Sequence, residues 1–101
     1  MDADMTITYE QARDRVRAEL EPTWRTGTFS IDDRTIVEND KMYVFEVGAR
    51  EYLKDRDPAF EIVGGVVVVY KNDGRVDSLP SVQVALDQSL QRRPNPEPVF
   101  I

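Results

Sequence analysis

The spacing of apolar residues near the start of the chain predicts a helix. Apolar side chains recur every three or four residues and form one stripe: Tyr9, Ala12, Val16 and Leu20. Gln11 follows Thr8 at the spacing of a capping box, and Pro22 cannot continue a helix. We therefore predict a helix over residues 8–21.

Alternation with a period of two follows the helix and predicts four strands. The predicted strands are Gly27–Val37, Lys41–Val47, Ile62–Tyr70 and Arg75–Leu79. Asp32 and Asp33 interrupt the first strand, where a turn or bulge suits them better than a strand centre. The second strand carries apolar residues on both faces and is broken by Gly48, so we expect it to be central. The turn 71–74 joins the last two strands into a hairpin.

Two further helical segments complete the predicted fold. Residues 49–54 favour a short helix, and Pro80-Ser81 begins a last helix. The expected stripe of this last helix is Val82, Ala85, Leu86 and Leu90. Arg92 and Arg93 would lie near its C-terminus. The prediction is an α+β fold: an antiparallel sheet of about four strands, with N-terminal, short middle and C-terminal helices packed on it. Residues 1–93 form a single domain, and the proline-rich residues 94–101 form an extended tail.

Gly64 and Gly65 precede four consecutive valines and raise the question of a phosphate-binding loop. Such loops lie between a strand and the N-terminus of a helix. Here the glycines lead into a β-branched run, which is typical of a buried strand. We interpret them as a bend or a close backbone approach.

The composition argues against an enzyme. The 101 residues include neither histidine nor cysteine, which removes the commonest general base, nucleophilic thiolates and most transition-metal ligands. Pairs of carboxylates such as Asp55 and Asp57 fall in predicted turns, where solvent keeps them ionised. We expect no catalytic residues, no metal site and no cofactor.

The net charge of the chain indicates which kind of molecule it could bind. Nineteen acidic residues against 13 basic ones give a net charge of −6. This charge is repelled by nucleic acid and by anionic lipid, and it attracts a basic protein. The N-terminus lacks the basic start and apolar run of a signal peptide, and no stretch is long enough to cross a bilayer. We expect a cytoplasmic protein.

Acidic residues concentrate between Ile31 and Glu46, in the first two predicted strands and the turn that joins them. These candidate partner-binding residues are Asp32, Asp33, Glu38, Asp40 and Glu46, with Tyr43 and Trp24 as apolar anchors. If the strands form a hairpin, the carboxylates gather along one edge and could dock a basic protein. The alternative is an edge strand that is protected by charge against aggregation. Aromatic residues at these spacings are also typical of a core.

Several motifs along most of residues 8–90 resemble a known family. They are the aromatic strand Tyr43-Val44-Phe45, the stretch Ala49-Arg50-Glu51-Tyr52-Leu53, the segment from Gly64 to Gly74, and Leu79-Pro80-Ser81. Together with the order of elements, they are similar to the small bacterial YrhB-like domain, a class of immunity protein in polymorphic toxin systems. The resemblance implies a protein that binds a toxin and has no catalytic residues. The acidic charge makes a basic toxin domain the expected partner. The chain is expected to be a monomer or a homodimer, since an exposed strand edge could pair with a second copy.

Two other functions stay open from the sequence. A chaperone-like or adaptor domain would hold several protein clients, using an exposed proline-rich tail and a sheet edge. A small enzyme or ligand-binding domain would need a deep polar pocket under the helices.

Overall fold

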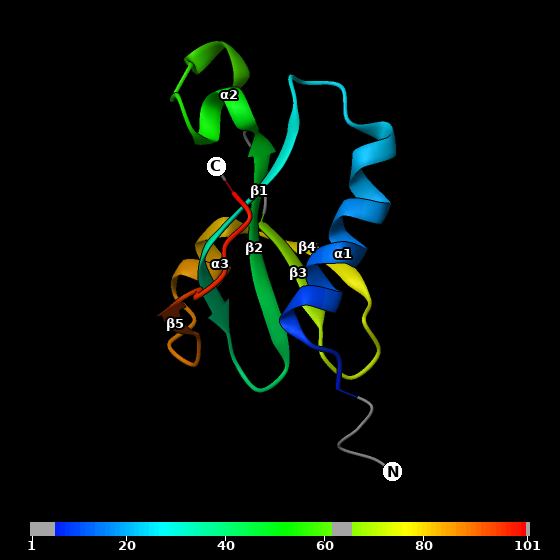
Figure 1. Ribbon diagram of the computed structural model, residues 1–101. Coiled ribbons are helices and arrows are strands. Elements are labelled where there is room, and N and C mark those ends of the chain that lie inside the picture. Colours follow the sequence, from blue (N-terminus) through cyan, green and yellow to red (C-terminus); the bar gives the residue numbers. More distant parts are fainter. Residues whose placement is uncertain (1–5, 62–65, 101) are drawn as a thin grey trace.

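The computed structural model describes residues 6–61 and 66–100 and shows an α+β fold, as predicted (Figure 1). The elements in chain order are α1 (Tyr9–Leu20), the 3-10 helix η2 (Glu21–Thr23), β1 (Phe29–Glu38), β2 (Met42–Ala49), α2 (Arg50–Leu53), the 3-10 helix η3 (Pro58–Phe60), β3 (Val66–Tyr70), β4 (Val76–Leu79), α3 (Ser81–Ala85) and β5 (Gln91–Pro94). The strands form one antiparallel sheet in the order β4-β3-β2-β1-β5. The sheet therefore has five strands, where about four were expected, and β2 is central as predicted.

Helix α1 confirms the prediction from the N-terminal stripe. The Thr8 hydroxyl accepts a hydrogen bond from the Gln11 amide (3.1 Å), and the Gln11 side chain accepts one from the Thr8 amide (2.9 Å). These reciprocal bonds satisfy two of the amides that every helix N-terminus leaves without a partner. Ala12 and Val16 are completely buried against the sheet, so the apolar stripe sets how α1 lies on it.

The main core lies between α1 and one face of the sheet. It contains Tyr9, Ala12, Val16, Phe29, Ile31, Ile36, Tyr43, Phe45 and Val69. The Tyr9 ring stacks on the Phe45 ring at 5.1 Å and meets the Tyr43 ring edge-on at 5.6 Å. Both geometries are favoured for aromatic pairs, and they stabilise the fold beyond the contribution from burial of the apolar area of the rings. These contacts fix α1 over the centre of β2.

The irregularity expected at Asp32 and Asp33 is a bulge within one continuous strand, β1. Asp32 pairs with Glu46 and the next described pair joins Val37 to Val44, so residues 33–36 of β1 lie opposite Phe45 alone. Such an insertion shifts which side chains point to the core. Before the shift the core-facing residues include Phe29, Ile31 and the fully buried Asp33, and after it the core-facing residue is Ile36.

The second hairpin and the middle helix match their predictions, with one correction at Gly48. Strands β3 and β4 flank the predicted turn, where Gly74 adopts a left-handed φ of 74°. Gly48 does not end its strand: it pairs with Ser30, and β2 continues to Ala49. A side chain there would meet Leu53 of α2 at 3.3 Å, so glycine allows α2 to fold back closely. Gly64 and Gly65 lie outside the described residues.

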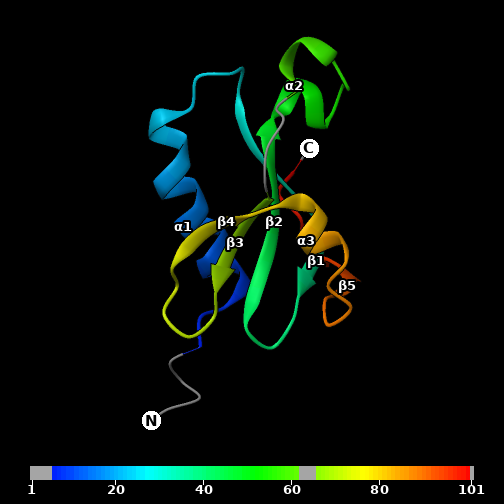
Figure 2. The same cartoon turned by 180° about the vertical axis from the view of Figure 1, so that it is seen from behind.

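The predicted C-terminal helix is largely wrong. Helix α3 has five residues, and its buried residue is Val84, which was not in the expected stripe. Val82 and Leu86 are 68% and 74% exposed. Asp87 accepts hydrogen bonds from the Ser89 amide and hydroxyl, and this turn ends the helical path. The chain crosses one face of the sheet and returns as β5, which contains Arg92 and Arg93 (Figure 2).

The proline-rich segment begins in a strand that ends at Pro94 and then bends at Pro96 and Glu97, and it is bound to the domain. Strand β5 pairs with residues 35–38 of β1, so the expected boundary after residue 93 falls inside a strand. Beyond it, Asn95 and Phe100 are buried. Figure 1 shows the red C-terminal segment running along β1. We call residues 91–100 the C-terminal strap.

Replacement of Thr8 by Ala should remove the capping box and lower the free energy of unfolding by about 1 kcal/mol. The exposed Thr6 provides a matched control, and Thr6→Ala should change stability by less than about 0.5 kcal/mol. Urea denaturation measures both variants. Equal stabilities would show that the cap contributes nothing.

Candidate functional site

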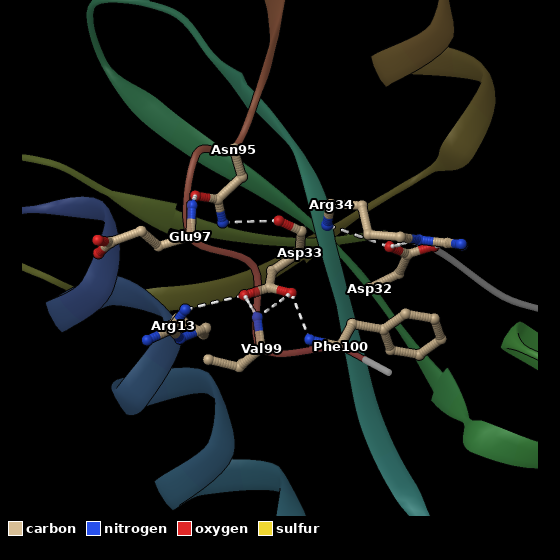
Figure 3. A network of polar contacts seen from close by, with 8 residues as sticks. All are labelled: Arg13, Asp32, Asp33, Arg34, Asn95, Glu97, Val99 and Phe100. Carbon is tan, nitrogen blue, oxygen red and sulfur yellow. Dashed lines mark hydrogen bonds and ion pairs between the residues drawn. The ribbon is translucent and has the colours of Figure 1, made fainter.

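Asp33 was predicted to contact a partner, but the structure places it at the centre of a buried polar network (Figure 3). Its carboxylate accepts hydrogen bonds from the Arg13 guanidinium of α1 (2.9 Å) and from the backbone amides of Val99 (3.0 Å) and Phe100 (2.9 Å). A buried carboxylate needs such donors, because its transfer out of water is costly. The network therefore ties α1, β1 and the C-terminal strap together.

Neighbouring groups extend this network along β1. The Asn95 side chain donates to the Asp33 carbonyl (2.7 Å), and the Asn95 amide donates to the Arg34 carbonyl (3.0 Å). The Arg34 guanidinium lies 4.7 Å from the centre of the Phe100 ring, within the range of a cation–π contact. Burial and the negative charge of Asp33 raise the pKa of the Tyr9 hydroxyl to about 12. Asp33 is thus not available to a partner in this structure.

Asp32 is also held by a cation. Arg34 donates to both of its carboxylate oxygens, at 2.9 Å and 2.6 Å. The hydrogen bonds from Arg34 lower the pKa of Asp32 despite its partial burial. Glu46 lies directly opposite Asp32 on β2 and is exposed. The positive charge of Arg34 therefore offsets the repulsion between the two carboxylates that face each other across the strands.

Glu38 bridges two cations from distant parts of the chain. Its carboxylate accepts from the Lys71 ammonium (2.7 Å) and from the Arg93 guanidinium (2.9 Å). Burial raises the pKa of Glu38, but the hydrogen bonds from Lys71 and Arg93 outweigh it, and the pKa lies below its ordinary value. This carboxylate joins β1 to the β3–β4 turn and to β5.

The two predicted aromatic anchors pack inside the molecule to different extents. Tyr43 is buried, its hydroxyl donates to the Ile7 carbonyl (3.1 Å), and the Lys71 ammonium lies 4.6 Å from its ring centre. Trp24 is half-buried and meets the Phe29 ring edge-on at 5.3 Å, while its indole N–H donates to the Thr26 carbonyl. Both residues belong to or border the core.

The seven predicted residues are therefore not gathered into one acidic face. Asp40 and Glu46 are the two exposed carboxylates among them. Asp40 precedes β2, whereas Glu46 lies in its second half, so the length of the strand separates them. Asp32 and Glu38 are paired with cations, and Asp33 is buried.

A different surface combines exposed apolar residues with a cleft. The cleft has a volume of about 560 Å³ and lies between α3 and the sheet face opposite α1. Val37, Val44 and Val66 are half-buried and lie on its sheet side, and Val84 of α3 also lines it. We define the α3 surface as this cleft together with the exposed side chains of Val82 and Leu86, which do not line the cleft and lie on another side of the helix from Val84.

The α3 surface is electrically balanced. Two carboxylates, from Asp32 and Glu46, and two guanidinium groups, from Arg34 and Arg92, line the cleft. The excess negative charge of the whole chain is therefore not concentrated here. Sequence reasoning missed this surface because it assigned Val82 and Leu86 to a buried stripe, although their spacing does place both on one side of a helix.

A second cleft, of about 660 Å³, lies on the other side of α3 and is more polar. Its lining includes Asn39, Asp40, Gln83, Asp87, Ser89 and Gln91. Asn39 and Ser89 bond to each other at 3.0 Å, and the same Ser89 hydroxyl donates to Asp87. Several polar side chains that line this cleft therefore already have hydrogen-bond partners within the protein.

No family model matches the sequence, and neither a curated protein nor a solved structure matches it significantly. Among residues 6–61 and 66–100, no helix is both long and apolar enough to span a membrane. The same described residues contain no group of three or more side chains suited to hold a metal ion.

Loss of the Asp33 carboxylate should destabilise the protein strongly. Asp33→Ala leaves two strap amides without an acceptor and removes the partner of Arg13, which should cost about 3 kcal/mol or more. The exposed Asp40 is the control, and Asp40→Ala should cost less than about 0.5 kcal/mol. Urea denaturation compares the two; a loss below about 1 kcal/mol for Asp33→Ala would contradict this role.

Glu38 should make stability depend on pH in the acidic range. Its pKa is lower in the folded protein than the ordinary value of 4.5, so its contribution is complete above pH 4.5 and is lost as the pH falls through the folded pKa. Glu38→Gln should therefore destabilise the protein more at neutral pH than at about pH 3. Denaturation at several pH values measures this difference, and a constant difference would refute the assignment.

Proposed function

We propose that this protein is an immunity-type binding protein, which neutralises a bacterial toxin by direct contact through the α3 surface. The observation that carries the proposal is the exposure of Val82 and Leu86 at α3, a helix whose other side forms one wall of a cleft lined by valines. Contiguous exposed apolar groups with a polar rim are typical of protein-binding sites in monomers. The resemblance of the sequence to the YrhB-like family supports the choice of a toxin as partner.

The balanced charge of the α3 surface changes the expected mechanism. Docking by a row of carboxylates would require free acidic groups, but Asp32 and Glu38 are neutralised by neighbouring cations. Affinity would instead come from burial of apolar area, at about 25 cal/mol per Å² before the costs of association. The net charge of −6 would then act at longer range and speed the approach of a basic toxin domain.

The chaperone-like alternative gains no support from the strap or from the β4 edge. The strap is bound along β1, with Asn95 and Phe100 buried, so it does not project as a free tail in this structure. On the β4 edge, the Ser78 amide donates to the Asp77 side chain (2.8 Å). An amide that already has an acceptor is less ready to pair with an added client strand.

The proposal predicts that a neighbouring gene encodes a protein with a toxin domain, and the test uses that domain. Calorimetry should detect tight binding to that domain, and co-expression should restore the growth of cells that produce it. Leu86→Ser and Val82→Ser should each weaken binding about tenfold or more, as expected for central apolar contacts. Val99→Ser is the matched control, because Val99 is exposed but lies on the strap.

The possible outcomes distinguish an error in the proposed interface from an error in the proposed function. Full affinity in the Leu86→Ser and Val82→Ser variants would reject the α3 surface as the interface. Absence of both binding and growth rescue with the native sequence would reject the proposed function itself.

A further inference from the structure

A small recess beside the cleft between α3 and the sheet is lined by basic residues. The recess has a volume of about 260 Å³, and it shares Arg34, Thr35 and Arg92 with the lining of the cleft. Arg93 and Pro94 complete its lining. Within the described residues, the recess thus has three arginines and no acidic residue, although the whole chain has a net charge of −6. We call these five residues the arginine recess.

Two of the three arginines are held in place by carboxylates. Asp32 accepts hydrogen bonds from Nε and Nη2 of Arg34, at 2.9 Å and 2.6 Å. Glu38 accepts hydrogen bonds from the same two nitrogens of Arg93, at 3.0 Å and 2.9 Å. A guanidinium group has five N–H donors, so both arginines keep further donors after these bonds. Arg92 forms no ion pair within residues 6–61 and 66–100. An anion in the recess can therefore accept hydrogen bonds from arginines of which two are already oriented.

The cleft beside the recess is mainly apolar. Val37, Val44 and Val66 of the sheet line it, together with Val84 and Ala85 of α3. The three sheet valines are half-buried, so a ligand that covers them removes more of their apolar area from water. The cleft volume of about 560 Å³ lies within the range of about 300–1,000 Å³ that is typical of small-molecule sites. A ligand that fits both the cleft and the recess has an apolar body and an anionic head.

The acidic residues of the cleft favour a head group with a single negative charge. Asp32 and Glu46 also line the cleft. A dianion, such as a phosphate monoester, meets more repulsion from these carboxylates than a monoanion does. We propose that the cleft binds a free alkyl carboxylate of medium length, with its chain against the valines and its carboxylate in the arginine recess. This inference does not rest on the proposed toxin binding, because Val82 and Leu86 do not line the cleft.

Titration of the isotope-labelled protein with decanoate at neutral pH, followed by nuclear magnetic resonance of the backbone amides, tests this proposal. Decanoate should cause saturable shifts at the residues of the cleft and the recess, with a dissociation constant below about 1 mM. Absence of saturation, or shifts spread over the whole surface, would overturn the proposal.

Decyltrimethylammonium provides the matched ligand control, because it has the same chain length and a cationic head. The net charge of −6 by itself favours the cation. Tighter binding of decanoate, by about tenfold or more, would therefore report the local arginines rather than the charge of the whole chain. Equal or tighter binding of the cation would contradict the placement of the carboxylate.

Replacement of Arg92 tests the position of the head group. Arg92→Gln should weaken the binding of decanoate about tenfold or more, because it removes a charged donor from the recess. Arg25→Gln is the matched control: Arg25 is exposed, lies between η2 and β1, and lines neither the cleft nor the recess. Equal affinities in the two variants would show that the carboxylate does not bind in the recess.

A bulky side chain at Ala85 tests the position of the alkyl chain. Ala85 is exposed and lines the cleft, so Ala85→Phe should occupy the cleft and abolish saturable binding while the fold is kept. Ala59→Phe makes the same change at an exposed residue of η3, outside the cleft, and should bind decanoate as the native protein does. Native affinity in the Ala85→Phe variant would reject the cleft as the site. The amide spectrum of each variant checks that it is folded.

Discussion

The buried carboxylate of Asp33 is the constraint on which the rest of this fold depends. A fully buried charge is tolerated only when hydrogen-bond donors surround it, and here the donors come from α1 and from the C-terminal strap. Asp33 follows Phe29 and Ile31 on the inward-facing side of β1, so its side chain points into the molecule. One residue therefore links the first helix, the second strand from the edge and the last residues of the described chain.

The position of the strap also determines which face of the sheet stays accessible to a partner. Because the strap is fixed along β1, the chain between β4 and β5 has to cross the face of the sheet opposite α1 (Figure 2). The short α3 covers that face incompletely, so valines of the sheet line a cleft and Val82 and Leu86 remain exposed. The proposed binding function derives from this incomplete cover of the sheet face.

The sequence predicted those parts of the structure that depend on local pattern. Helix α1, the central position of β2 and the β3–β4 hairpin follow from residue spacing and turn chemistry within short windows. The end of the chain could not be predicted in this way, since the helical pattern after Pro80 is overridden by pairing of β5 with β1. The pairing of the candidate site residues could not be predicted for the same reason: the donors to Asp33 and the cations of Glu38 lie 20 to 67 residues away in the sequence.

Hydrogen exchange at the amides of Val99 and Phe100 tests the central role of Asp33 most directly. Val99 has a side chain that is 58% exposed, close to a proline-rich stretch, and local sequence alone would suggest rapid exchange. If Asp33 holds the strap as described, both amides should exchange as slowly as those of the β1–β2 pairing. Exchange at the rate of an unstructured peptide would show that the buried carboxylate does not hold the strap in solution.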